Sequence, residues 1–120
     1  MRPTQPNSIN RLEQLNKYMG NDPTSNMSYL LEKLSPSVIV PEPDKYYTFV
    51  YTPKTRNIRY DQHPFIQVSS VQKWGFVGLN YHWDDFRRYS WAECGTPLFE
   101  IYPDEIEIAQ TLPIALFKQS

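Results

Sequence analysis

A concentration of aromatic side chains in the middle of the chain constrains its fold more than any other feature. Of the 18 aromatic residues in the 120-residue sequence, 13 lie between Tyr46 and Trp91. Aromatic side chains bury a large apolar area, so this block can supply the core of a small domain by itself. Because aromatic residues favour strands over helices, we expect the domain to be rich in β-structure.

The spacing of apolar residues after Lys45 is that of strands. Tyr47, Phe49 and Tyr51 alternate with Tyr46, Thr48 and Val50, which predicts a strand with rings on both faces. We expect further strands near residues 58–60, 64–71, 74–81, 98–102 and 113–118, a helical turn at 90–93 and a helix at 104–111. These elements predict an α+β protein with a small, strongly bent antiparallel sheet or an SH3-like partial barrel.

Two short amphipathic helices are expected before the aromatic block, over residues 9–19 and from residue 25 or 26 to residue 34. Each carries an apolar stripe, and the stripes include Leu12, Leu15 and Met19 in the first helix and Leu30 and Leu31 in the second. Neither helix is long enough to be stable alone in water. Each stripe must therefore pack on the chain's own domain or on a neighbouring chain.

The segment Val38-Ile39-Val40, between prolines, is an extended apolar connector of the kind that adds to a sheet edge. The change of period after it predicts two parts. Residues 1–44 form an extended and helical N-terminal arm, and residues 45–120 form a small β-barrel-like domain.

Charge, cysteine content and hydropathy exclude several classes of protein. The net charge is −1, with a balance of +4 over residues 45–92 and −4 over residues 93–120, so the total does not predict non-specific nucleic-acid binding. The single cysteine, Cys94, excludes an intramolecular disulfide and fits a reducing cytoplasm. The sequence shows neither a signal peptide nor an apolar run of membrane-spanning length, so we expect no membrane partner.

The sequence contains one cluster of residues that commonly bind metals: Asp61, His63, His82, Asp84 and Asp85. Two histidines and a carboxylate can bind iron, zinc or manganese. The alternative is that Asp61 is a turn residue, that Asp84-Asp85 form a helix start or a loop and that Pro64 holds His63 extended, and this interpretation is preferred. Cys94 follows Glu93, which would raise its pKa, and no nucleophile or phosphate-loop motif is present. We therefore predict no catalytic residue, no cofactor and no metal.

Nucleic-acid binding is a second hypothesis. Trp74, Trp83 and Trp91 lie near Lys73, Arg87 and Arg88 in the sequence, and rings beside basic groups suit the stacking of single-stranded bases. The alternative is that the rings form the core and the cations are solvated. A sequence pI near 6.1 favours that alternative, because it lacks the basic character of most such binders.

Residues 45–118 resemble a family of small, mostly uncharacterised proteins of T4-like tailed phages, especially those that infect marine cyanobacteria. The matching segments are residues 46–51 with 53–55, 60–64, 74–76 with 78–83, 88–91 and 113–118. The resemblance implies a phage origin and a virion or assembly component. It carries no catalytic residue, because no activity is attached to these motifs.

The leading hypothesis is a non-enzymatic phage structural or assembly protein that docks into a virion complex: the tail, baseplate, neck or capsid. It would be made in the host cytoplasm, reside in the virion in several copies and contact other phage structural proteins. A nucleic-acid-binding accessory protein acting during infection is the alternative. The predicted partner-binding residues are Leu12, Leu15, Met19, Leu30, Leu31, Trp83, Arg87, Arg88 and Trp91.

Overall fold

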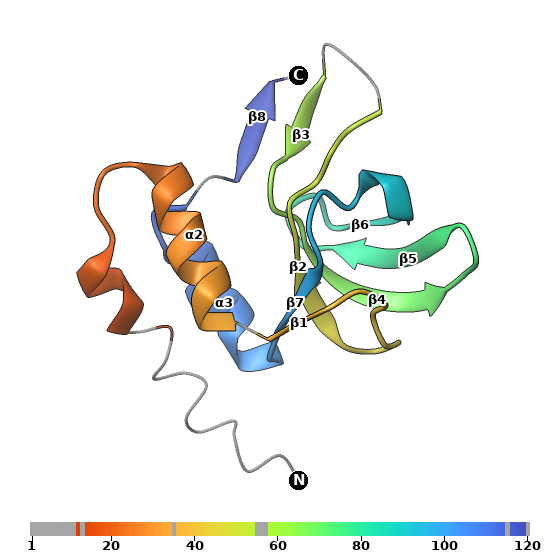
Figure 1. Ribbon diagram of the computed structural model, residues 1–120, viewed down its shortest axis with the longest axis horizontal. Coiled ribbons are helices and arrows are strands. Elements are labelled where there is room, and N and C mark those ends of the chain that lie inside the picture. The colour runs from red at the N-terminus through yellow and green to blue at the C-terminus, as the bar shows by residue number, and fades with distance from the viewer. Residues whose placement is uncertain (1–11, 13, 35, 55–57, 115, 120) are drawn as a thin grey trace, which may run out of the picture.

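The protein has an α+β fold built on one antiparallel sheet, as predicted from the sequence (Figure 1). The structure, a computed structural model, describes residues 12, 14–34, 36–54, 58–114 and 116–119. The six strands of the large sheet are, in spatial order, β1 (Ser37–Val38), β7 (Leu98–Ile101), β2 (Tyr46–Thr48), β4 (Phe65–Val71), β5 (Gly75–Asn80) and β6 (Asp85–Ser90). The SH3-like classification stays a prediction.

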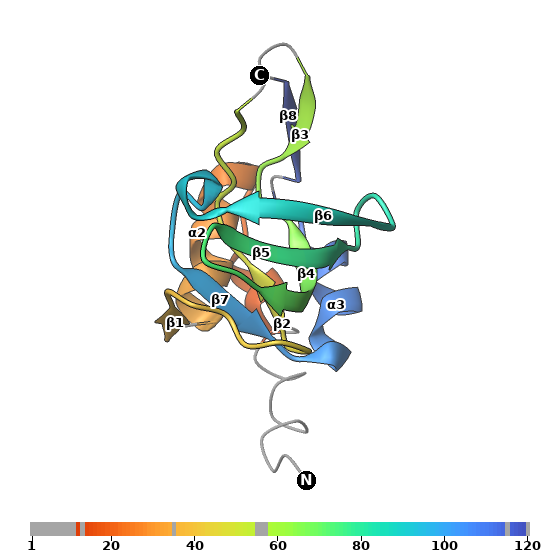
Figure 2. The same ribbon diagram turned by 90° about the vertical axis from the view of Figure 1, so that its right-hand side faces the viewer.

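A second, two-stranded ribbon pairs β3 (Arg59–Asp61) with β8 (Phe117–Gln119). Figure 2 shows this ribbon extending beyond the large sheet on the side of β6. The described helical segments are η1 (Gln14–Tyr18), α2 (Pro23–Leu34), η2 (Trp91–Glu93), η3 (Pro103–Glu105) and α3 (Ile106–Thr111), where η marks a 3-10 helix.

One face of the sheet is covered by helices. Leu12, Met27 and Leu30 share a buried cluster with Phe65 of β4 and Ile101 of β7. Ala109 of α3 and Leu112 and Ile114, which follow it, complete this cluster. The N-terminal helical segment and the sheet therefore share one core, although the predicted division at residue 44 stays a prediction.

The other face of the sheet encloses an aromatic core. Tyr47, Phe49, Phe76 and Tyr89 are buried there, and the ring of Phe49 meets those of Phe76 and Tyr89 edge-on at 5.9 and 5.5 Å. The alternation in β2 confirms the prediction of rings on both faces, because Tyr46 packs against the helix-side cluster and Tyr47 lies in the aromatic core.

Close backbone packing requires glycine in β5. A Cβ at Gly78 would lie 2.9 Å from the carbonyl oxygen of Gln67, and one at Gly75 would overlap the carbonyl oxygen of Tyr89. Both contacts are to neighbouring backbone rather than to flexible side chains, so neither can relax easily. Both glycines therefore mark a close approach of neighbouring backbone within the sheet.

The N-terminal helices differ from the predicted bounds. The second helix begins at Pro23, earlier than expected, because Asp22 accepts hydrogen bonds from the Thr24 amide and the Ser25 hydroxyl at 3.2 and 2.7 Å. Proline suits the first helical position, since its missing N–H would have no partner there. Residues 9–11 and 13 of the first predicted helix lie outside the described residues, and residues 14–18 form a 3-10 helix.

Strand β6 was missed by the sequence prediction, which placed a helix start or loop at Asp84-Asp85. Asp84 instead adopts a left-handed conformation with φ 54° in the turn, and Asp85 begins the strand. The four residues from Asp85 to Arg88 are all exposed. They lack the apolar alternation by which a strand is recognised in sequence.

Two other local predictions can be compared with the structure. The connector Val38-Ile39-Val40 adds to the sheet edge only in part, because Ser37 and Val38 pair with Phe99 and Leu98 of β7 while Ile39 and Val40 lie beyond the strand. The second prediction is confirmed. The turn at residues 90–93 is a 3-10 helix with a capping box, in which Glu93 accepts hydrogen bonds from the amide and hydroxyl of Ser90 at 2.9 and 2.8 Å.

Candidate functional site

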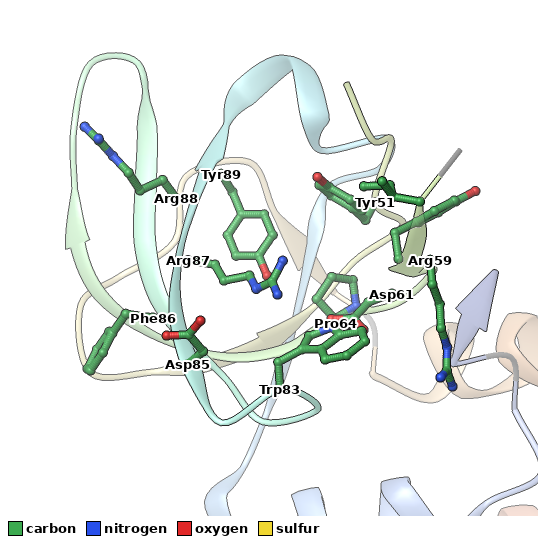
Figure 3. A pocket seen from close by; sticks show the side chains of 12 residues that line it. Tyr51, Arg59, Asp61, Pro64, Trp83, Asp85, Phe86, Arg87, Arg88 and Tyr89 are labelled. Carbon is green, nitrogen blue, oxygen red and sulfur yellow. Dashed lines mark hydrogen bonds between the residues drawn. The ribbon is translucent and has the colours of Figure 1, made fainter. Parts of the chain in front are cut away.

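A cleft of about 390 Å³ opens between β3 and β6, at the outer edge of the sheet (Figure 3). Consecutive residues of β6 form one wall, and β3 with the preceding Ile58 forms the other. Its lining residues are Tyr51, Ile58, Arg59, Tyr60, Asp61, Pro64, Trp83, Asp85, Phe86, Arg87, Arg88 and Tyr89. The two walls come from different sheets, because β6 belongs to the large sheet and β3 to the two-stranded ribbon.

The pairing of β6 with β5 decides which of its side chains face the cleft. Arg87 lies opposite Gly78 and Tyr89 opposite Phe76, on the face that carries the aromatic core. Because side chains alternate along a strand, Phe86 and Arg88 lie on the other face. Figure 3 shows Arg87 pointing toward Trp83 and Tyr89, while Phe86 and Arg88 point away.

A buried hydrogen-bond network forms the polar floor of the cleft. Asp61 accepts a hydrogen bond from the Trp83 indole at 2.6 Å and another from the Asn80 amide. Asn80 also donates to the Tyr89 hydroxyl at 2.8 Å, and its oxygen accepts the backbone N–H groups of His82 and Trp83. The network fixes the indole of Trp83 at the mouth of the cleft, where 38% of that residue is exposed.

Tyrosine hydroxyls in and beside the cleft are held neutral. Burial raises the pKa of Tyr89 above its usual value. Burial, and then the 3.0 Å hydrogen bond to the Glu93 carboxylate, raise the pKa of Tyr51 to about 12. These groups can donate and accept hydrogen bonds near neutral pH, but they do not ionise there.

The arginines around the cleft stack on aromatic rings. The guanidinium carbon of Arg59 lies 4.4 Å from the centre of the Phe117 ring. The corresponding distance is 5.5 Å from Arg87 to the Trp83 ring and 4.9 Å from Arg88 to the Trp74 ring. Within the described part of the chain, none of the three has a carboxylate oxygen within 4.0 Å. Stacking leaves the N–H groups at the guanidinium edge available to an anion.

The residues of the possible metal-ligand cluster have other contacts in the structure. The Asp61 oxygens bond to Asn80 and Trp83, and a ring nitrogen of His82 lies 3.3 Å from the His63 carbonyl oxygen. Burial lowers the pKa of His82, and the nearby Asp61 carboxylate opposes that shift. Among the described residues, no three or more His, Cys, Asp or Glu side chains are grouped to hold a metal ion.

The structure corrects part of the predicted partner-binding set. Leu12, Leu15 and Leu30 are buried in the helix-side core, and Met19 and Leu31 pack against it. Their apolar stripe is therefore covered by the chain's own sheet and α3 rather than free to contact a partner. Of the two alternatives for these helices, the structure shows that they pack on the chain's own sheet and not on a neighbouring chain.

The remaining predicted residues divide between two places. Trp83 and Arg87 meet at the cleft, whereas Arg88 borders it from β6 with its side chain pointing away. Trp91 does not join them: its ring packs near Phe76, and its indole donates to the Lys73 carbonyl oxygen at 2.7 Å. It lines a separate hollow of about 520 Å³ with Ile39 and Val40, beside β1.

Sequence reasoning missed Arg59, Phe86 and Tyr60 as cleft residues. The period-2 pattern of β6 is hidden by its exposed polar residues, so Phe86 had no recognisable strand around it. Arg59 reaches its ring partner through the pairing of β3 with β8, across more than fifty residues of sequence. Local patterns carry no sign of such a contact.

Comparison of the chain with protein-family models, curated proteins and solved structures gives no match. Within the described residues, no helix is both long and apolar enough to cross a membrane. The geometry of the cleft and of the sheet edges therefore carries the functional argument.

Proposed function

We propose that the protein is a non-enzymatic docking component of a tailed-phage virion, held in place by contacts at the edges of its sheet. The phage assignment rests on the resemblance of residues 45–118 described above. The docking role rests on exposed apolar side chains at both edges of the large sheet.

Those edges carry the proposal. At one edge, Ile39 is 78% exposed and Val40 58% exposed, directly after β1. At the other, Phe86 of β6 is 62% exposed. Large apolar side chains exposed at the edges of a sheet favour contact with another chain.

Mass spectrometry of purified phage particles, washed in high salt and compared with infected-cell lysate, tests this function. We expect the protein at a stoichiometric level in the washed particles. Its abundance in lysate together with absence from particles would contradict a virion role.

A matched pair of variants tests the edges. Phe86→Ser should lower the amount of protein retained in washed particles, because it removes an exposed ring at the β6 edge. Tyr29→Ser, which alters an exposed ring on α2, should leave retention unchanged. Equal retention of both variants would exclude the β6 edge from docking.

The ring-stacked arginines favour a second candidate, a nucleic-acid-binding accessory protein acting during infection. Guanidinium groups beside exposed rings can contact phosphates and stack on bases. This function predicts salt-sensitive binding of a single-stranded oligonucleotide that weakens in Arg87→Ala and Arg88→Ala. Absence of binding at low salt would remove it.

A further inference from the structure

Strand β6 offers a regular edge to another chain. It pairs with β5 over all six of its residues without a register shift, and no further strand lies beyond it in the described part of the sheet. An edge strand presents alternating backbone N–H and C=O groups. The amide of the last residue, Ser90, already donates to the Glu93 carboxylate, so the edge open to a partner runs from Asp85 to Tyr89, roughly 16 Å at about 3.3 Å per residue.

The cleft lies along that edge and carries a positive charge on each wall. Arg59 stands on the β3 side and Arg87 on the β6 side, each stacked on a ring and each without an ion pair among the described residues. A stacked guanidinium is held in orientation, so less side-chain entropy is lost when it binds a carboxylate. Both charges therefore favour an anionic occupant.

The same surroundings favour a peptide over a nucleic acid. A peptide strand supplies both hydrogen-bond donors and acceptors to the β6 backbone, whereas a phosphate chain supplies acceptors alone.

We propose that the cleft between β3 and β6 binds an extended acidic segment of a partner protein, which adds as a strand to the edge of β6. This inference rests on the proposed docking function and names the kind of partner that one of the sheet edges accepts. Backbone hydrogen bonds provide the attachment, and the two arginines select for carboxylates.

The alternation of β6 sets the pattern of the partner segment. Side chains on the cleft face of the added strand meet Arg87 and Arg59, so acidic residues belong at alternate positions. Side chains on the opposite face lie near Phe86, so apolar residues belong between them. A sequence alternating glutamate with valine fits both faces.

Fluorescence anisotropy with the full-length protein tests this proposal. The probe is a labelled, end-capped eight-residue peptide in which glutamate alternates with valine, measured at low ionic strength. We expect saturable binding that weakens by about tenfold or more in Arg87→Gln and in Arg59→Gln, because each loses a charge-assisted hydrogen bond. Lys33→Gln, which removes an exposed positive charge on α2, should bind like the unmodified protein.

Changes to the probe separate strand addition from simple charge attraction without altering the protein. N-methylation of alternate peptide nitrogens on the side facing β6 should abolish binding, and replacing glutamate with glutamine should weaken it by about tenfold or more. Equal binding of the N-methylated peptide would overturn strand addition. Circular dichroism and thermal unfolding confirm that each protein variant is folded.

Two further outcomes overturn the proposal. One is tighter binding of a twelve-residue oligothymidylate with the same arginine dependence, which would make the cleft a nucleic-acid site. The other is the absence of saturable peptide binding. Particle retention distinguishes these outcomes from a failure of the docking function itself. The measurement uses a double variant that carries Arg59→Gln and Arg87→Gln. Normal retention of this variant in particles would leave the docking function intact and reject the cleft as the docking site.

Discussion

At the scale of single residues, the buried carboxylate of Asp61 organises the floor of the cleft. It is 4% exposed and accepts hydrogen bonds from Asn80 and from the indole of Trp83. A buried donor that loses its acceptor costs more than the net value of the bond, because it has given up water as well. The cleft therefore depends on this residue for its shape.

Asp61→Ala should lower the free energy of unfolding by about 2–4 kcal/mol, because it leaves two donors without an acceptor. Urea denaturation measures the change. Asp85→Ala, an exposed carboxylate at the same cleft, should change stability by no more than about 0.5 kcal/mol. Equal effects of the two substitutions would contradict the structural role of Asp61.

Cys94 provides a second test at this scale. Burial, reinforced by the neighbouring Glu93, raises the pKa of its thiol to about 11. At pH 8 the thiolate fraction should then be roughly a hundredfold below that of a free thiol, since thiolate falls tenfold per unit of pKa. Iodoacetamide should label the native protein slowly, with a rate that rises toward pH 11, and label it rapidly in urea. A fast native reaction at pH 8 would contradict the raised pKa of this half-buried thiol.

At the scale of elements, Asn26 ties the N-terminal helical segment to the C-terminal part of the chain. Its side chain donates to the carbonyl oxygens of Gly20 and Pro113 at 3.0 and 2.6 Å and accepts the Gly20 amide at 3.0 Å. One amide thus joins the start of α2, the loop before it and the segment after α3.

Asn26→Ala should therefore destabilise the protein by about 2–3 kcal/mol, since buried backbone groups lose their partners. Ser28→Ala, on the exposed face of the same helix, is the matched control and should stay within about 0.5 kcal/mol. Thermal or urea unfolding of both variants gives the comparison. A loss below 0.5 kcal/mol for Asn26→Ala would mean that water replaces this link readily.

Elements differ in how far the sequence predicted them. Strands β4 and β5 and the turn at Ser90 were predicted because their apolar alternation or capping residues are local. Strand β6 was not, because Asp85 to Arg88 are all exposed and its position comes from pairing with β5. The same hidden strand forms one wall of the candidate cleft, so the cleft could not be assembled from sequence.

At the scale of the whole molecule, the helical segment and the sheet depend on each other for burial. Met27, Leu30 and Leu34 are each at most 3% exposed, and they cover Phe65 and Ile101 of the sheet. Removal of the helices would expose both sets of side chains to water. The described helices of the predicted N-terminal arm are therefore part of the core.

Deletion of residues 1–35 should abolish cooperative unfolding or lower stability by more than about 5 kcal/mol, a large share of the stability of a domain this size. Leu30→Ala alone should cost about 2–5 kcal/mol, whereas Tyr29→Ala, beside it but exposed, should cost about 0.5 kcal/mol or less. Calorimetry of the three proteins makes the comparison. A truncated protein with an unchanged unfolding transition would show that residues 36–120 fold independently.

The sequence by itself determined the α+β class, the aromatic core and most strands, because these follow from composition and from the local period of apolar residues. It did not determine where the amphipathic helices pack, since an apolar stripe indicates that one face of a helix is buried but not which surface covers that face. The tertiary structure decided that the helices cover the chain's own sheet. It also decided that Arg59, Trp83 and Arg87 meet at one cleft, because strand pairing brings together residues whose separation along the chain leaves no local pattern.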